Sequence, residues 1–158
     1  MSDVKPKWAY EPRWYPCKVV EWIDGDTAVV DIDRGHGQWS LGEKVRLRRS
    51  DAAESSSTDP KLKQMADLAH HWVNYLVPGG TFNRLVTYYT PNSEVEEREK
   101  FGRIQADFAI GTAMSLTTVL FQKRLTVPYG GENKVKVQEK HLENWEYHEL
   151  NGSFSVLT

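Results

Sequence analysis

The sequence predicts an α+β fold in which a small β-barrel carries two to three helices. Three observations lead to this prediction. The chain has 158 residues, of which 39% are hydrophobic, and this suits one domain with a single core. Short β-type runs come before most of the helical patterns, without the regular alternation of a parallel sheet. One well-marked helical pattern separates the third of these runs from the fourth.

Five stretches have the composition of strands. The first two, residues 17–23 and 27–33, flank an Asp-Gly pair that is typical of a hairpin turn. The third, residues 43–50, follows the glycine-containing connection "RGHGQWSLGE". The last two, residues 81–90 and 101–110, lie on either side of the polar loop "PNSEVEEREK". We expect the first three runs to form a meander.

The best-marked helix begins after Asp59. An aspartate at the N-cap with Pro60 at the first helical position is a typical start signal, and "PGG" ends the pattern. Between them, apolar residues recur at helical spacing: Leu62, Met65, Ala66, Ala69, Trp72, Val73 and Leu76. A second helix is predicted from Thr112 to about Leu125.

Five strands with a helix between the third and the fourth is the element order of a five-stranded Greek-key barrel of the OB type. We therefore expect an N-terminal arm at residues 1–16, a barrel domain at 17–130 and a C-terminal tail at 131–158. The tail has a weak helical pattern around Leu142 and Trp145, which predicts that it is only partly helical.

Charge and hydropathy narrow the possible partners. Twenty basic and 22 acidic residues leave a formal charge of -2, so any contact with nucleic acid is expected to be local. No apolar run approaches the about 20 residues that cross a bilayer. The first residues, "MSDVKPKWAYEPRW", lack the pattern of a secretory signal. We therefore expect a cytoplasmic protein without membrane contact.

The cysteine and the histidines do not indicate a metal site. Cys17 is the single cysteine, and it is expected to pack inside a strand. None of the five histidines has the spacing of zinc ligands. We expect the pair in the tail, His141 and His148, to lie at the surface or to be partly buried.

Strand alternation predicts which charged residues face away from the core. In "EKVRLRRSD", Val45 and Leu47 are expected to face inward, which sends Arg46 and Arg48 outward. The same alternation in "FGRIQADFAI" sends three further side chains outward: Arg103, Gln105 and Asp107. Two strands of the barrel thus present an arginine on the outer face.

Three carboxylates lie near the ends of these strands. Asp26 is at the first turn, where Asp24 suffices for the turn itself, and Asp51 and Glu54 follow the third strand. Carboxylate oxygens suit Ca²⁺ or Mg²⁺, a further carboxylate can deprotonate a water, and arginines donate paired hydrogen bonds to phosphate. Each residue alone has an ordinary explanation as a turn or surface residue. Together they are the residue types that phosphodiester hydrolysis requires.

The ordered series "IDGDT", "VRLRRSDAAE", "EKFGR" and "LTVPYGG" resembles the staphylococcal (micrococcal) nuclease family, the thermonucleases, over about residues 17–130. The resemblance implies an OB-fold, Ca²⁺-dependent nuclease that acts on DNA or RNA and leaves 3'-phosphate ends. Mg²⁺ is the alternative cofactor.

The resemblance also implies a role for each site residue. Asp26, Asp51 and the main-chain carbonyl of Ala52 would bind the metal, and Glu54 would be the general base. Arg46 and Arg103 would stabilise the transition state. Lys100 would bind a terminal phosphate and Tyr129 would stack on a base.

Three departures from the family pattern keep other functions open. Ala52 and Ala53 replace Thr-Pro, Phe101 replaces a tyrosine, and the loop before Arg103 is acidic through Glu94, Glu96, Glu97 and Glu99. One alternative is a catalytically weak or silent OB-fold module that binds nucleic acid or protein. Another is an inhibitor or assembly protein that binds a protein partner through its arm or its tail.

Overall fold

The computed structural model describes residues 11–89, 98 and 101–158. The strands are β1 (Arg13–Trp22), β2 (Thr27–Gly35), β3 (Gln38–Leu47), β4 (Ser50–Asp51), β5 (Phe82–Thr87), β6 (Ile104–Ile110), β7 (Met114–Ser115) and β8 (Val127–Pro128). The helices are α1 (Pro60–Leu76), α2 (Leu116–Gln122) and α3 (Lys134–Leu150), with a 3₁₀-helix at Ser153–Leu157.

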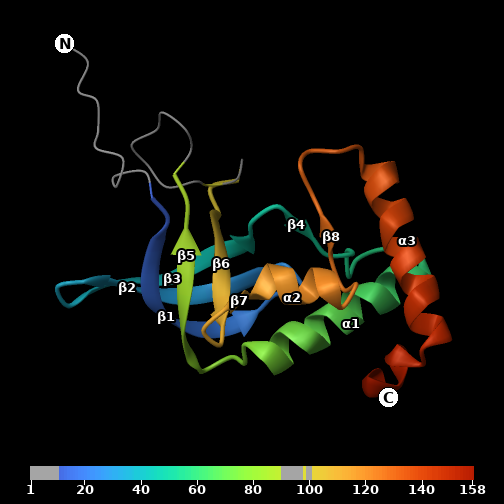
Figure 1. Cartoon of the computed structure of the whole chain (residues 1–158), viewed down its shortest axis with the longest axis horizontal. Coiled ribbons are helices and arrows are strands. Elements are labelled where there is room, and N and C mark those ends of the chain that lie inside the picture. Colours follow the sequence, from blue (N-terminus) through green and yellow to red (C-terminus); the bar gives the residue numbers. More distant parts are fainter. Residues whose placement is uncertain (1–10, 90–97, 99–100) are drawn as a thin grey trace, which may run out of the picture.

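The main sheet closes into a ring. Its strand order is β3-β2-β1-β5-β6-β7, and β3 also pairs with β6. The β3–β6 pair is parallel and the other pairs are antiparallel. Figure 1 shows the three helices together at one end of this sheet. The prediction of a barrel-like α+β fold is confirmed.

Two strands are longer than the sequence indicated. β1 begins at Arg13 rather than at Cys17, because Arg13–Pro16 pair with β5. β2 and β3 are joined by a turn of two residues, His36 and Gly37, with φ of 55° and 73°. Positive φ at both positions is what a tight type I′ hairpin needs. The residues after the turn therefore belong to β3 and not to a loop.

The first predicted helix is confirmed, while the second is shorter than predicted. Asp59 caps α1, since its Oδ1 accepts a hydrogen bond from the Lys61 amide at 2.9 Å. α2 begins at Leu116 and not near Thr112, because Met114–Ser115 pair with β6 as β7. The Ser115 hydroxyl then caps α2.

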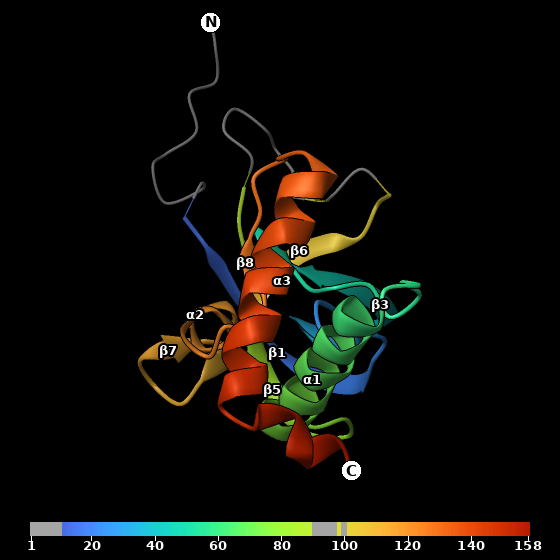
Figure 2. The same cartoon turned by 90° about the vertical axis from the view of Figure 1, so that its right-hand side faces the viewer.

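The C-terminal helix differs most from its prediction. α3 is a continuous helix of 17 residues that lies beside α1 and β8 (Figure 2). Its buried residues are Val137, His141, Asn144 and His148. Both tail histidines are therefore buried, at 1% and 5% exposure, whereas they were expected to lie at the surface or to be partly buried.

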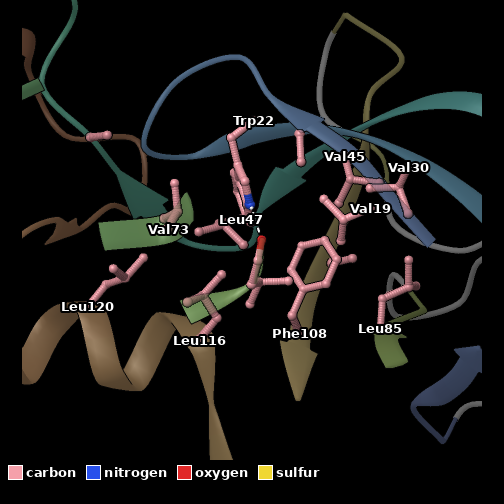
Figure 3. Packing of buried hydrophobic residues seen from close by; sticks show 14 of the residues in the cluster. Val19, Trp22, Val30, Val45, Leu47, Val73, Leu85, Phe108, Leu116 and Leu120 are labelled. Atoms are coloured by element: carbon pink, nitrogen blue, oxygen red, sulfur yellow. Dashed lines mark hydrogen bonds between the residues drawn. The ribbon is translucent and has the colours of Figure 1, made fainter. Parts of the chain in front are cut away.

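The main hydrophobic core lies inside the ring. Trp22 and Phe108 are in edge-to-face contact, with ring centroids 5.5 Å apart, and the Trp22 Nε1–H donates to the Val77 carbonyl at 2.8 Å (Figure 3). Leu116 and Leu120 of α2 pack onto the same cluster. Cys17 is fully buried as predicted, and this burial raises its pKa to about 12. The core thus ties α2 to the sheet.

Asp107 is an exception to the predicted outward face of β6, because α2 covers it. Its carboxylate accepts hydrogen bonds from the Phe108 amide at 2.8 Å, from the Thr117 amide at 3.1 Å and from the Thr117 hydroxyl. Asp107 is 7% exposed and anchors the start of α2. In the described part of the chain, no helix has the length and apolar character to cross a membrane.

Candidate active site

The turn "DGD" at the start of β2 lies against α1 and the chain that follows β4. A Cβ built on Gly25 would lie 2.6 Å from the Ala69 Cβ and 3.0 Å from the Ala52 Cβ, so the close approach requires glycine. Asp24 closes the turn, since its Oδ1 accepts a hydrogen bond from the Asp26 amide at 3.0 Å. The two aspartates therefore have different roles, as predicted for Asp24.

Negative charge is concentrated at this turn. Burial, followed by the hydrogen bond and the charge of Asp26, raises the pKa of Asp24 to about 7. A cation close to these carboxylates relieves their repulsion. The guanidinium of Arg46 is the cation beside Asp26, at 3.3 Å.

Arg46 joins the two predicted metal-binding aspartates. Its Nη2 lies 3.3 Å from Asp26 Oδ2 and 3.3 Å from Asp51 Oδ1, and it donates to the Ser50 carbonyl at 3.1 Å. The register of the sheet explains this contact, because Thr27 of β2 pairs with Arg46 of β3. Carboxylate oxygens from two separate segments thus meet at one nitrogen atom.

Asp26 is held on both of its oxygens. Oδ1 accepts from the Thr27 hydroxyl at 2.9 Å, and Oδ2 accepts from the Ala52 amide at 2.9 Å. The amide of Ala52 is therefore beside Asp26, whereas the predicted ligand is the Ala52 carbonyl. A carboxylate has about four acceptor positions, so these hydrogen bonds leave capacity for a cation.

A cleft of about 720 Å³ opens beside this cluster. Six of the predicted site residues line it: Arg46, Asp51, Ala52, Glu54, Arg103 and Tyr129. Asp26, which is 7% exposed, is not among the lining residues and reaches the cleft through its partners. The predicted site residue Lys100 lies outside the described residues. The same holds for the four acidic residues of the preceding loop: Glu94, Glu96, Glu97 and Glu99.

Arg103 reaches the cleft through the ring closure. β3 and β6 pair in parallel with Arg46 opposite Gln105, so Arg103, two residues earlier, lies on the same face as Arg46. The Arg103 guanidinium carbon is 5.9 Å from the centroid of the Phe101 ring, and Phe101 is 74% exposed. The two predicted phosphate-binding arginines therefore line one cleft.

Glu54 differs from the aspartates in its exposure. Its side chain is 63% exposed, and its Oε1 lies 3.6 Å from Lys134 Nζ at the start of α3. Tyr129 is 37% exposed, and its amide donates to the Arg49 carbonyl at 2.9 Å. Both residues lie in the cleft with solvent access, as a proton acceptor and a stacking residue would need.

The sequence did not predict several residues of the cleft. These are Arg49, Arg98, Lys134, Gln138 and His141. His141 makes the shortest contact to the predicted ligands, with Nε2 2.8 Å from Asp51 Oδ2. The buried residues of α3 follow a 4-3-4 spacing, but three of the four are polar, so hydropathy did not mark His141 as buried.

The donor set of this site fits a hard divalent cation. Oxygens of Asp26 and Asp51 converge on one cationic nitrogen, and main-chain oxygens are typical further ligands of Ca²⁺. Among residues 11–89, 98 and 101–158, no three His, Cys, Asp or Glu side chains group as a metal site. A cation bound here would therefore need main-chain and water oxygens besides the two carboxylates.

Comparison with known proteins assigns no family to the chain. No protein-family model matches it, and no curated protein matches it.

Proposed function

We propose that this protein is a metal-dependent nuclease that hydrolyses phosphodiester bonds of DNA or RNA. One observation carries the proposal. Asp26 and Asp51 meet at the guanidinium of Arg46, beside a cleft that is also lined by Glu54 and Arg103. Residues from four separate segments thus supply metal ligands, a proton acceptor and phosphate-binding groups in one place.

The proposal includes an OB-type barrel as the scaffold. The ring of β1, β2, β3, β5 and β6, with α1 between the third and the fourth of these strands, supports this assignment. Arg46 and Asp51 lie on the paired strands β3 and β4, while Asp26 directly precedes β2 and Arg103 directly precedes β6. Paired strands fix the positions of catalytic side chains better than loops do.

The proposed cofactor is Ca²⁺, with Mg²⁺ as the alternative. Asp26, Asp51 and the Ala52 carbonyl would hold it, and it would neutralise the phosphate and polarise the phosphorus for attack.

The protein's own groups supply the remaining chemistry. Arg46 and Arg103 donate hydrogen bonds to phosphate oxygens and stabilise the charge that develops on them. Glu54 accepts the proton of the attacking water. Its carboxylate is exposed, so a water molecule from solvent can reach it. Tyr129 stacks on a base and Lys100 binds a terminal phosphate. The expected products carry 3'-phosphate ends.

A cleavage assay on single- and double-stranded DNA and on RNA tests the proposal, in Ca²⁺, in Mg²⁺ and with a chelator. Glu54→Gln removes the proton acceptor, so we expect the cleavage rate to fall by about 10²- to 10⁴-fold with unchanged thermal unfolding. Glu132→Gln is the matched control, because Glu132 lines the same cleft but has no role in the proposed chemistry. A folded wild-type protein that cuts none of the substrates with either metal would refute the proposal.

A binding module without catalysis is the second candidate. Arg49, Arg98 and Lys134 line the cleft with the two predicted arginines, and Phe101 exposes an aromatic ring there. Cations and exposed rings bind nucleic acid without a metal. This candidate predicts that a labelled single-stranded oligonucleotide binds equally well with and without chelator, and that Asp51→Asn binds at least as tightly as wild type.

A further inference from the structure

We propose that His141 of α3 is a positioning residue for Asp51, so that α3 forms part of the metal site. This inference rests on the proposed function, since it assumes that Asp51 is a metal ligand. It assigns a role to a residue of the C-terminal tail, which the predicted ligand set did not include.

The contact is short, and its histidine partner is buried. His141 Nε2 lies 2.8 Å from Asp51 Oδ2, and the histidine is 1% exposed. The other oxygen, Oδ1, faces Arg46 Nη2 at 3.3 Å. His141 therefore holds one oxygen of the carboxylate, while the other oxygen is directed at Arg46. Fixing one oxygen also fixes the plane of the carboxylate.

The second ring nitrogen shows what the histidine contributes. Within the described residues, the buried Nδ1 of His141 has no hydrogen-bond partner. A buried polar atom without a partner costs free energy, which an apolar side chain of similar size would avoid. The packing of α3 alone therefore does not require histidine at this position. The hydrogen bond to Asp51 accounts for a side chain with an N–H donor at this position.

A second buried histidine of α3 provides the contrast. His148 uses both ring nitrogens for structure, since Nε2 lies 2.9 Å from the Arg124 carbonyl and Nδ1 lies 2.8 Å from the Ser153 hydroxyl. Neither partner belongs to the candidate site. The two histidines lie on the same helix and are similarly buried. A comparison of variants at the two positions therefore distinguishes an effect on Asp51 from an effect on the docking of α3.

Outer hydrogen bonds of this kind have a measurable effect on metal sites. A ligating carboxylate is usually held by such a partner, and removing the partner typically costs about 10- to 100-fold in metal affinity or activity. The other contact from α3, between Lys134 and Glu54, joins two exposed side chains and is expected to contribute little.

The test compares His141→Gln with His141→Met in the full chain. Both side chains have similar length, but only the glutamine amide can donate to Asp51. His148→Met is the control for lost packing and hydrogen bonding in α3. Ca²⁺ affinity is measured by isothermal titration calorimetry, and the Ca²⁺-dependent rise in unfolding temperature provides a second measurement. Cleavage kinetics follow with the same variants.

We expect His141→Met to weaken Ca²⁺ binding by about 10- to 100-fold, while His141→Gln and His148→Met bind like the wild type. If the methionine variant fails to fold, His141→Asn replaces it, because its shorter amide cannot reach Asp51. Equal affinity of the Gln and Met variants, or an equal loss in His148→Met, would overturn the positioning role alone. A wild-type protein that binds no Ca²⁺ would overturn the proposed metal site, and the inference with it.

Discussion

At the scale of single residues, Gly25 explains much of the geometry of the first turn. The turn sits so close to α1 that a methyl group on Gly25 would be 2.6 Å from the Ala69 Cβ. The neighbouring Asp26 accepts a hydrogen bond from the Ala52 amide at 2.9 Å. The sequence pattern identified the turn from the Asp-Gly pair, but a close approach to a helix more than 40 positions away leaves no local signal.

Gly25→Ala is expected to destabilise the protein by about 1–3 kcal/mol, because the added methyl group overpacks the contact with Ala69 and Ala52. Urea denaturation followed by tryptophan fluorescence measures the effect. Gly130→Ala is the control, since its nearest neighbour is a side-chain oxygen of Glu132 at 3.4 Å. The control should be unchanged or slightly more stable. Equal stability of the two variants would contradict the packing role of Gly25.

At the scale of elements, the sequence predicted those whose signals are local. Asp59 and Pro60 mark the start of α1 within two positions, and α1 begins where they place it. The start of α2 was wrong because β7 pairs with β6 first, a contact that helical periodicity does not show. The prediction that Asp107 faces solvent was wrong because it also ignored a contact between elements. Strand alternation separates two faces, but it does not show that α2 covers the outer one.

α3 was underestimated because its buried face is mostly polar. His141, Asn144 and His148 occupy positions that a hydrophobic stripe would normally fill. Each has a hydrogen-bond partner in another segment, which a pattern based on hydropathy does not detect.

The burial of His148 makes the docking of α3 sensitive to pH. Burial is the main cause that lowers the pKa of His148 below its ordinary value of 6.5. The unfolded chain therefore binds a proton more readily than the folded protein does. The contribution of His148 to stability is complete above about pH 6.5 and is lost as the pH falls through the lowered pKa.

We therefore expect the free energy of unfolding to fall as the pH decreases below about 6.5, and His148→Gln to reduce this slope. Urea denaturation at a series of pH values measures both. His36→Gln is the control, because His36 is exposed in the turn between β2 and β3 and should leave the slope unchanged. An identical slope in His148→Gln and wild type would exclude His148 as the cause.

At the scale of the whole molecule, ring closure assembles the candidate site. Asp26, Asp51 and Arg103 are far apart in the sequence, and the parallel β3–β6 pair brings the last of them to the face of Arg46. The order of motifs and the alternation along β3 were enough to predict that Arg46 faces outward. The contact of His141 with Asp51 spans 90 positions and depends on how α3 docks, so no local pattern predicts it.

The distribution of charge leads to a prediction for the whole molecule. The formal charge is -2, yet five cationic side chains line one cleft: Arg46, Arg49, Arg98, Arg103 and Lys134. Nucleic acid should therefore be bound by this local group and not by a general positive field. Each phosphate neutralised on a single strand contributes about -0.7 to the slope of log K against log salt concentration. Five contacts predict a slope of about -3.5.

Fluorescence anisotropy of a labelled single-stranded oligonucleotide, measured over a series of salt concentrations without added metal, provides this slope. Arg49→Ala should reduce it by about 0.7, because one phosphate contact is removed. Arg34→Ala removes the same charge from the exposed end of β2, outside the cleft, and should leave the slope unchanged. If both variants change the slope equally, overall charge governs binding and the cleft is not the site. If only Arg49→Ala changes the slope, nucleic acid binds in the cleft despite the net negative charge of the protein. This cleft is also lined by Asp51 and Glu54, where hydrolysis is proposed to occur.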